Sequence, residues 1–300
     1  MNKTKNLSRY IAEMTIAMLL WGVAWTAGKV SAEHANAHVA AFWRYAISFI
    51  TIIPVVWYMK IPLGTNAKGV FYMLIAGILT SLFNYFFFAG LAHGQAGYGG
   101  TMVTALAPII TYVISIAFLG IEVNLRQVTA LAIGIAGALI LLKVPFDGFG
   151  FLNADSLYFL GCAVVWAMVT IFSQKASRVA HPMFYTLIVF GITAFINMLF
   201  ALPSHPFDFG FYDSTFWLTI IFIGLLPGTF STTLYFLSAG KIGAHNTGVF
   251  MFIVPIGAIL SSWMVYGEEP AFSTVVGCLL AFAAVLLFNL KRSTRQKEAI

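Results

Sequence analysis

Charged side chains are scarce in this sequence: 9% of its 300 residues are charged, whereas 60% are hydrophobic. A soluble globular protein carries about 25% charged residues, because water must solvate its surface. The composition therefore excludes a soluble domain. The mean hydropathy of +0.91 predicts a protein embedded in a lipid bilayer.

Cysteine is also scarce, and the spacing of Cys162 and Cys278 is typical of neither a disulfide nor a metal site. His34 and His38 lie four residues apart without a third ligand, so we expect them in a solvated loop. The motifs Gly-x-Ser-x-Gly and His-Glu-x-x-His are absent, and no paired aspartates lie within an apolar segment. The sequence thus predicts no catalytic residue, no metal and no cofactor.

Ten apolar segments are long enough to cross a bilayer as helices. They comprise residues 10–30, 39–59, 70–92, 97–119, 127–144, 155–175, 183–203, 214–238, 244–266 and 272–290. Short tails at 1–9 and 291–300 flank these segments. The sequence therefore predicts an all-α polytopic membrane protein with ten transmembrane helices.

The two halves of the chain, 10–144 and 155–290, repeat one pattern. In each half a proline within an apolar segment precedes a glutamate by fourteen residues, and a tryptophan lies in the first segment. The matching pairs are Pro108 and Pro255, Glu122 and Glu269, and Trp21 and Trp166. We assign structural roles to the prolines and glutamates, the glutamates as groups that hold helix ends. Because each half has five spans, the second repeat must lie inverted relative to the first, which is the plan of secondary transporters.

Lysine and arginine lie mostly on one side of the predicted spans. Thirteen of the sixteen fall in the two tails or in the connections on the side of the tails, which predicts cytoplasmic termini in a cell (inner) membrane. Lys29 lies at a helix end on the other side and is interpreted as a topological residue. Contact with anionic membrane lipid explains the net charge of +6, so no nucleic-acid partner is expected.

Polar residues at helical spacing within the spans indicate a solute pathway, because a polar group in lipid is costly. The candidate substrate-binding residues are Trp21 and Trp25 on the first span, Arg44 on the second, Ser81, Asn84 and Tyr85 on the third, Thr104 on the fourth, Trp166 and Thr170 on the sixth, Tyr235 on the eighth and Asn246 on the ninth.

The fifth and tenth spans differ from the others. Residues 130–142 and 275–288 have no such polar side chains, so we expect these two spans outside the central cavity, against lipid or a partner. Ala130, Gly134 and Ala138 form a series of small residues that can pack against another helix, which allows a homodimer.

Arg44 is the one cation predicted well inside a span. Its guanidinium can clamp a carboxylate, which favours a substrate-binding role. It can equally fix a gate through backbone carbonyls or extend to the membrane interface, so both roles remain open. Glu13, near the start of the first span, is interpreted as a solvated helix-start residue rather than a proton-coupling group.

Several of these features occur together in a known family. The sequence resembles EamA-type drug/metabolite transporters in its duplicated ten-span plan, in Trp21-Gly22 with Lys29 eight residues later, in Arg44 within Phe-Trp-Arg-Tyr, and in the two proline–glutamate pairs. The resemblance implies a secondary carrier of small organic solutes, often an exporter of amino acids or related amphipathic compounds, with a central cavity and alternating access. A channel or a membrane-embedded enzyme is the alternative. The second half lacks the Trp-Gly pair, so we expect the first half to recognise any charge on the substrate.

Overall fold

The structure, a computed structural model, describes residues 3–119, 125–143, 145, 154–242 and 250–289. These residues contain no strand. Their helices are α1 (Lys3–His34), α2 (Ala37–Tyr58), α3 (Ala67–Leu91), α4 (Ala96–Leu119), α5 (Leu125–Leu141), α7 (Ala154–Ala176), α8 (Pro182–Ala201), η2 (Leu202–Ser204), α9 (Ser214–Ile223), η3 (Gly224–Ser231), α10 (Thr232–Ile242), α12 (Ile253–Tyr266) and α13 (Phe272–Asn289).

Seven helical segments of the described chain are long and apolar enough to cross a membrane, and three shorter apolar helices accompany them. The three shorter ones are α5, α12 and α13. The predicted eighth span is one continuous segment made of α9, η3 and α10. These ten segments lie where ten spans were predicted, which confirms the predicted fold class.

Polar side chains fix where several helices begin. Asn36, Asn66 and Asp213 each accept a hydrogen bond from the backbone amide three residues later, at the start of α2, α3 and α9. Such a bond satisfies an amide that has no partner in the first turn of a helix. At the other end of a span, Gly267 terminates α12 with a left-handed φ of 64°, which favours glycine.

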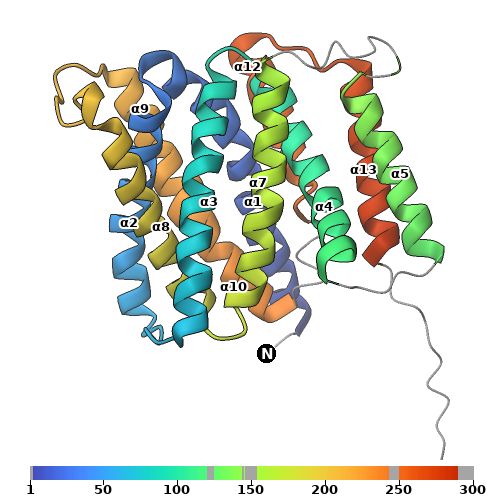
Figure 1. Cartoon of the computed structure of the whole chain (residues 1–300), viewed down its shortest axis with the longest axis horizontal. Helices are drawn as coiled ribbons and strands as arrows, with labels where there is room; N and C mark the ends of the chain where they lie inside the picture. Colours follow the sequence, from blue (N-terminus) through green and yellow to red (C-terminus); the bar gives the residue numbers. More distant parts are fainter. Residues whose placement is uncertain (1–2, 120–124, 144, 146–153, 243–249, 290–300) are drawn as a thin grey trace, which may run out of the picture.

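The helix contacts repeat between the two halves. Between the two halves, α1 corresponds to α7, α3 to the α9–η3–α10 span, and α4 to α12. The α1–α12 contact therefore has the α7–α4 contact as its counterpart. In the same way, the α3–α7 contact has the contact between α1 and the α9–η3–α10 span as its counterpart. The α2–α8 and α5–α13 pairs are their own counterparts. Since five crossings separate the start of α1 from the start of α7, the two repeats run in opposite directions (Figure 1).

Helices α5 and α13 lie together at one edge of the molecule (Figure 1). They pack mainly on each other and on α4. Their backbones approach closely, because a Cβ at Gly277 would lie 2.7 Å from the carbonyl oxygen of Gly137. Ala130 and Gly134 are buried there, so the helix against which this series of small residues packs belongs to the same chain.

The eighth span is interrupted by the π-helix η3, which the sequence analysis did not predict. Pro227 lies within it and has no amide hydrogen to donate, so the regular pattern of helical hydrogen bonds cannot continue through this turn. Glycines bring η3 against α2: a Cβ at Gly224 would lie 2.9 Å from the carbonyl oxygen of Arg44. The interruption therefore lies beside the predicted buried cation.

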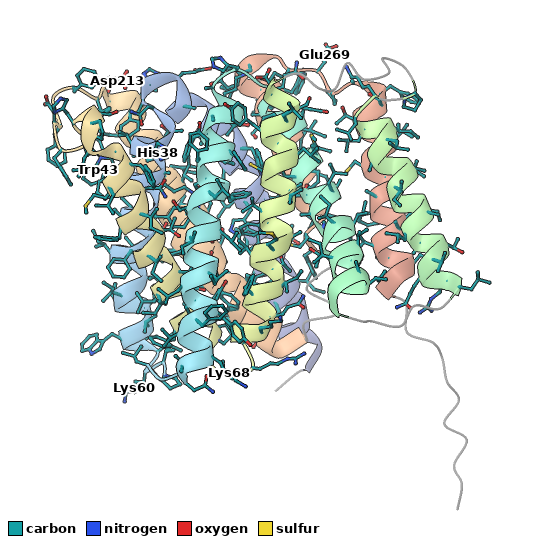
Figure 2. All side chains as sticks on the ribbon, in the orientation of Figure 1. His38, Trp43, Lys60, Lys68, Asp213 and Glu269 are labelled. Carbon is teal, nitrogen blue, oxygen red and sulfur yellow. The ribbon has the colours of Figure 1, made fainter. Side chains whose placement is uncertain are left out.

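The molecule has two chemically different ends. Lys60 and Lys68 lie at the end where the described chain begins, which we call the lysine end (Figure 2). His38, Trp43, Asp213 and Glu269 lie toward the other end, which we call the opposite end.

Candidate functional site

Arg44 of α2 points toward α3. Its Nη1 donates a hydrogen bond to Oδ1 of Asn84 at 3.2 Å. Asn84 is fully buried, and its own amide group donates to the carbonyl oxygen of Thr80 at 2.7 Å, which orients the side-chain oxygen toward the guanidinium. The guanidinium also lies over the rings of Phe87 and Tyr45, at 4.9 and 5.5 Å from their centres.

No acidic residue in the described part of the chain neutralises Arg44. The ion pairs found there join Arg9 to Glu13, Lys29 to Glu268 and His34 to Asp213. A guanidinium has five N–H donors and keeps its charge at any physiological pH. The arrangement can therefore receive an anion, because a charge held away from water is costly unless it is paired.

An aromatic wall connects Arg44 with candidates from both halves. Trp25 packs on Phe87 at 4.7 Å between ring centres, and Trp166 packs on Phe83 at 4.9 Å. Phe83 and Phe87 stack on each other at 6.0 Å. The two tryptophans were predicted from the sequence, but the two phenylalanines that join them were not.

A second cluster forms where α1 meets η3 and α10. The indole Nε1 of Trp21 donates to the carbonyl oxygen of Pro227 at 2.9 Å, and its ring lies 5.5 Å from that of Tyr235. Ser231 lies between Pro227 and Tyr235 in sequence, one helical turn from each. Its hydroxyl is buried and has no hydrogen-bond partner among the described residues. A buried hydroxyl without a partner is costly, so this group is an open position in the packing of the second cluster.

Ser81 and Tyr85 belong to a different contact, between α2, α3 and α8. Asn197 donates to Ser81 at 2.9 Å and lies 3.4 Å from Nδ1 of His38. The His38 ring stacks between Tyr85 and Phe200, at 5.0 and 5.1 Å. The expectation of a solvated histidine loop was therefore wrong, because both histidines lie in helices. His34 ends α1 and pairs with Asp213 at 2.9 Å.

Two other candidates bond to their own helices. Thr104 donates to the carbonyl oxygen of Gly100 at 2.6 Å, and Thr170 donates to that of Trp166 at 2.8 Å. These hydroxyls need no solute to satisfy them. Asn246 and Glu122 lie outside the described residues, and Pro108 and Pro255 lie inside α4 and α12.

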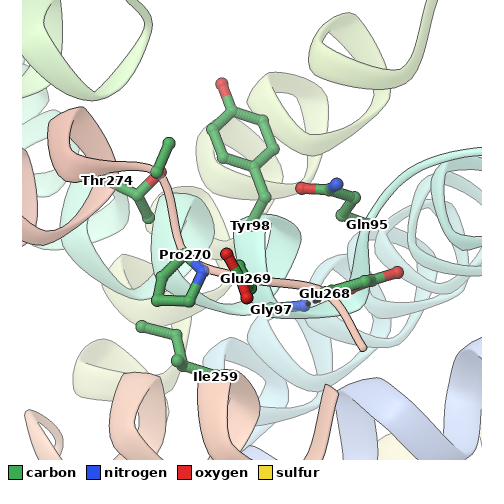
Figure 3. Close-up of a pocket in the computed structure, with 9 residues that line it drawn as sticks. Gln95, Gly97, Tyr98, Ile259, Glu268, Glu269, Pro270 and Thr274 are labelled. Atoms are coloured by element: carbon green, nitrogen blue, oxygen red, sulfur yellow. Dashed lines mark hydrogen bonds between the residues drawn. The ribbon is translucent and has the colours of Figure 1, made fainter. Parts of the chain in front are cut away.

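The contacts predicted for Glu269 are made by its neighbour. Glu268 accepts a hydrogen bond from Nζ of Lys29 at 2.5 Å, one from Ser262, and one from the amide of Gly97 at 3.4 Å, whereas Glu269 is exposed. Lys29 is therefore part of a buried ion pair, which corrects its interpretation as a topological residue. The two acids share the rim of one hollow (Figure 3).

The chain is similar to known membrane transporters. Its sequence matches the EamA-like transporter family over residues 9–143 and again over residues 155–290. An uncharacterized transporter of Bacillus subtilis (strain 168) is 22% identical over 291 residues, which cover 96% of this chain and 93% of that protein. The riboflavin transporter of Vibrio cholerae serotype O1 is 23% identical, with 94% and 95% covered. A probable terminal-alkyne amino-acid exporter of Streptantibioticus cattleyicolor is 24% identical, with 70% and 69% covered. A solved crystal structure with 18% identity has the same fold, with a TM-score of 0.63 over 93% of this chain and 96% of its own.

Proposed function

Because the chain belongs to the EamA-like transporter family, we propose that it is a secondary carrier that exports small organic solutes bearing a carboxylate, such as amino acids or related amphipathic compounds. That it is a multi-pass membrane transporter follows from the family and from its apolar helices. The solute class, the direction and the carrier cycle are the proposal.

The observation that carries the proposal is the part-buried guanidinium of Arg44. Among the described residues no carboxylate pairs with it, and Asn84 supplies a neutral oxygen that orients it without cancelling its charge. A solute carboxylate can supply the missing negative charge through two parallel N–H···O bonds. One such charge-assisted contact contributes about 1.5–3 kcal/mol.

The surroundings of Arg44 fit an amphipathic solute. The rings of Tyr45 and Phe87 lie against the guanidinium, and Trp25 continues the apolar surface from Phe87. A solute with one anionic group and an apolar side chain would match both features. Two relatives are named as a transporter of riboflavin and a probable exporter of an amino acid, which supports organic solutes as a class.

The repeat supports alternating access between the two sides of the membrane. The helix–helix contacts have counterparts when the two halves are exchanged, so two states that mirror each other can use similar packing. We place the lysine end in the cytoplasm, because basic residues concentrate on the cytoplasmic side of a cell membrane. The opposite end is then the outer end, and both termini are cytoplasmic.

The test compares solutes that differ only in the carboxylate. The purified protein is given phenylalanine, leucine and methionine, and in parallel the amines formed by their decarboxylation. We expect the protein to bind the amino acids more strongly than the amines. Binding of the amino acids should weaken in Arg44→Lys, which keeps the charge but not the two parallel N–H donors of the guanidinium. It should weaken further in Arg44→Gln, which loses both. Equal effects of the variants on amino acids and amines, at normal protein abundance, would assign Arg44 a structural role.

A further inference from the structure

One ion pair connects three helices at the outer end. Nζ of Lys29, on α1, lies 2.5 Å from Oε1 of Glu268, just after α12. The other oxygen of Glu268 accepts from Ser262 of α12 and from the amide of Gly97 near the start of α4. Both charged side chains are largely buried, at 15% and 9% exposed. An ion pair so shielded is much less weakened by solvent than one on the surface.

The surrounding contacts close the same end. Nζ of Lys29 also lies 4.4 Å from the centre of the Tyr266 ring, and the Tyr266 hydroxyl donates to Glu33 of α1 at 3.0 Å. Closer to the membrane centre, Thr26 of α1 bonds to Ser261 of α12 at 2.6 Å. Water cannot pass between α1 and α12 here unless these contacts separate.

Glu268 is nevertheless close to the outer surface. It lines a hollow together with Gln95, Glu269 and Pro270, all three of which are exposed (Figure 3). A proton from the outer solution therefore has a short path to the carboxylate.

We propose that the Lys29–Glu268 pair is the latch of the outer gate, and that a proton taken up by Glu268 from outside opens it. Protonation forms one O–H bond on the carboxylate, and Lys29 keeps its ammonium. The pair thereby changes from neutral to a net charge of +1. If the carrier exports its solute, as in the function proposed above on which this step rests, proton entry would accompany solute release.

The sign of the pH effect follows from the contacts of the closed gate. Lys29, Ser262 and the Gly97 amide all donate to Glu268 in the closed gate. A protonated carboxyl carries a donor O–H that would face one of these donors, so protonation opposes the contacts of the closed gate. A proton must therefore bind the open state more tightly, and acid must shift the population toward it. The other charged or titratable groups around Glu268 are Glu33 on α1, Tyr266 on α12, Tyr98 on α4 and Glu269 beside it.

The neighbour of Glu268 offers a matched control. Glu269→Gln removes the same charge from the same hollow but is exposed, whereas Glu268→Gln breaks the latch. The reporter is Thr26→Cys, placed beneath the latch in a chain whose Cys162 and Cys278 are replaced by Ala. A membrane-impermeant maleimide is added from outside. The rate at which it labels the reporter is normalised to its labelling rate in Gln95→Cys, a variant at an exposed position.

At neutral pH we expect slow labelling of the reporter in the parent and in Glu269→Gln. In Glu268→Gln we expect labelling about tenfold faster or more, because loss of one partner of a buried ion pair shifts an equilibrium at least that far. Mild acid should accelerate the parent and Glu269→Gln but not Glu268→Gln. Equal labelling of the two glutamine variants, or acid acceleration that survives in Glu268→Gln, would overturn the proposal.

A charge exchange covers the case in which Glu268→Gln does not fold. Lys29→Glu alone should label fast, and its combination with Glu268→Lys should slow labelling again by restoring an ion pair. Failure of the combined variant to slow labelling would count against the latch. The labelling needs no solute, so a negative result leaves the Arg44 proposal intact, and a failed Arg44 test leaves the latch intact.

Discussion

Asn84→Asp should block carboxylate recognition while the fold is kept. Asn84 presents Oδ1 to Nη1 of Arg44 at 3.2 Å, in a fully buried position. Aspartate has nearly the same shape, but it places a fixed negative charge beside the guanidinium. The carboxylate of this aspartate would then pair with the Arg44 guanidinium, which we propose binds the carboxylate of the solute.

The expected loss can be worked out from the contact that is replaced. A solute carboxylate on Arg44 contributes about 1.5–3 kcal/mol. At about 1.4 kcal/mol per factor of ten, its affinity should fall roughly 10- to 100-fold. The variant also loses the amide that donates to Thr80 at 2.7 Å. That neutral bond contributes about 1 kcal/mol, so the new ion pair with Arg44 should compensate for it.

Asn197→Asp provides the matched control. Asn197 is also fully buried, and it also donates to the carbonyl oxygen four residues earlier, that of Thr193. Its neighbours are Ser81 and His38 rather than an arginine. Binding is measured by calorimetry on the purified proteins, with the amino acids and with the corresponding amines. Asn197→Asp should retain the preference for amino acids.

Two results would refute this reasoning. One is unchanged binding of amino acids to a folded Asn84→Asp variant. The other is an equal loss in both aspartate variants. Either would show that Arg44 does not recognise the carboxylate.

Two further predictions concern packing and the second cluster. Gly137→Ala should lower the unfolding temperature, because the new Cβ would lie 2.9 Å from the amide nitrogen of Ala281 on α13, at a cost of about 1–3 kcal/mol. A Cβ at Gly64 would meet no described residue within 4 Å, so Gly64→Ala should be neutral in the same thermal scan. An equal fall in both variants would contradict the close α5–α13 packing. Ser231→Ala should leave the unfolding temperature unchanged, because the hydroxyl has no partner among the described residues, and should weaken solute binding about threefold to tenfold. A lower unfolding temperature with unchanged binding would give Ser231 a structural role instead.

The spans could be predicted because membrane helices leave a strong signal in sequence. Each needs a long apolar run, and the repeated proline–glutamate spacing revealed the duplication. The π-helix η3 left no such signal, since Pro227 lies within an apolar run, as Pro108 and Pro255 also do. Whether a proline interrupts a helix depends on its tertiary neighbours.

The site could be predicted only in part, for similar reasons. Arg44 and Asn84 were both selected because polar groups are rare in spans, yet their contact depends on how α2 packs on α3. Phe87 could not be selected, because phenylalanine is common along the whole chain. The repeat favoured Glu269 over Glu268, but the turn at Gly267 directs the first of the two acids inward.

Solute counterflow in proteoliposomes tests the central claim most directly. Vesicles with the purified protein are preloaded with an unlabelled amino acid that it binds, and uptake of the same labelled amino acid is followed. A carrier for carboxylates predicts faster uptake into preloaded vesicles, no acceleration when the decarboxylated amine is loaded instead, and loss of the effect in Arg44→Gln. Uptake that does not depend on preloading, or that both solutes accelerate equally, would contradict the account.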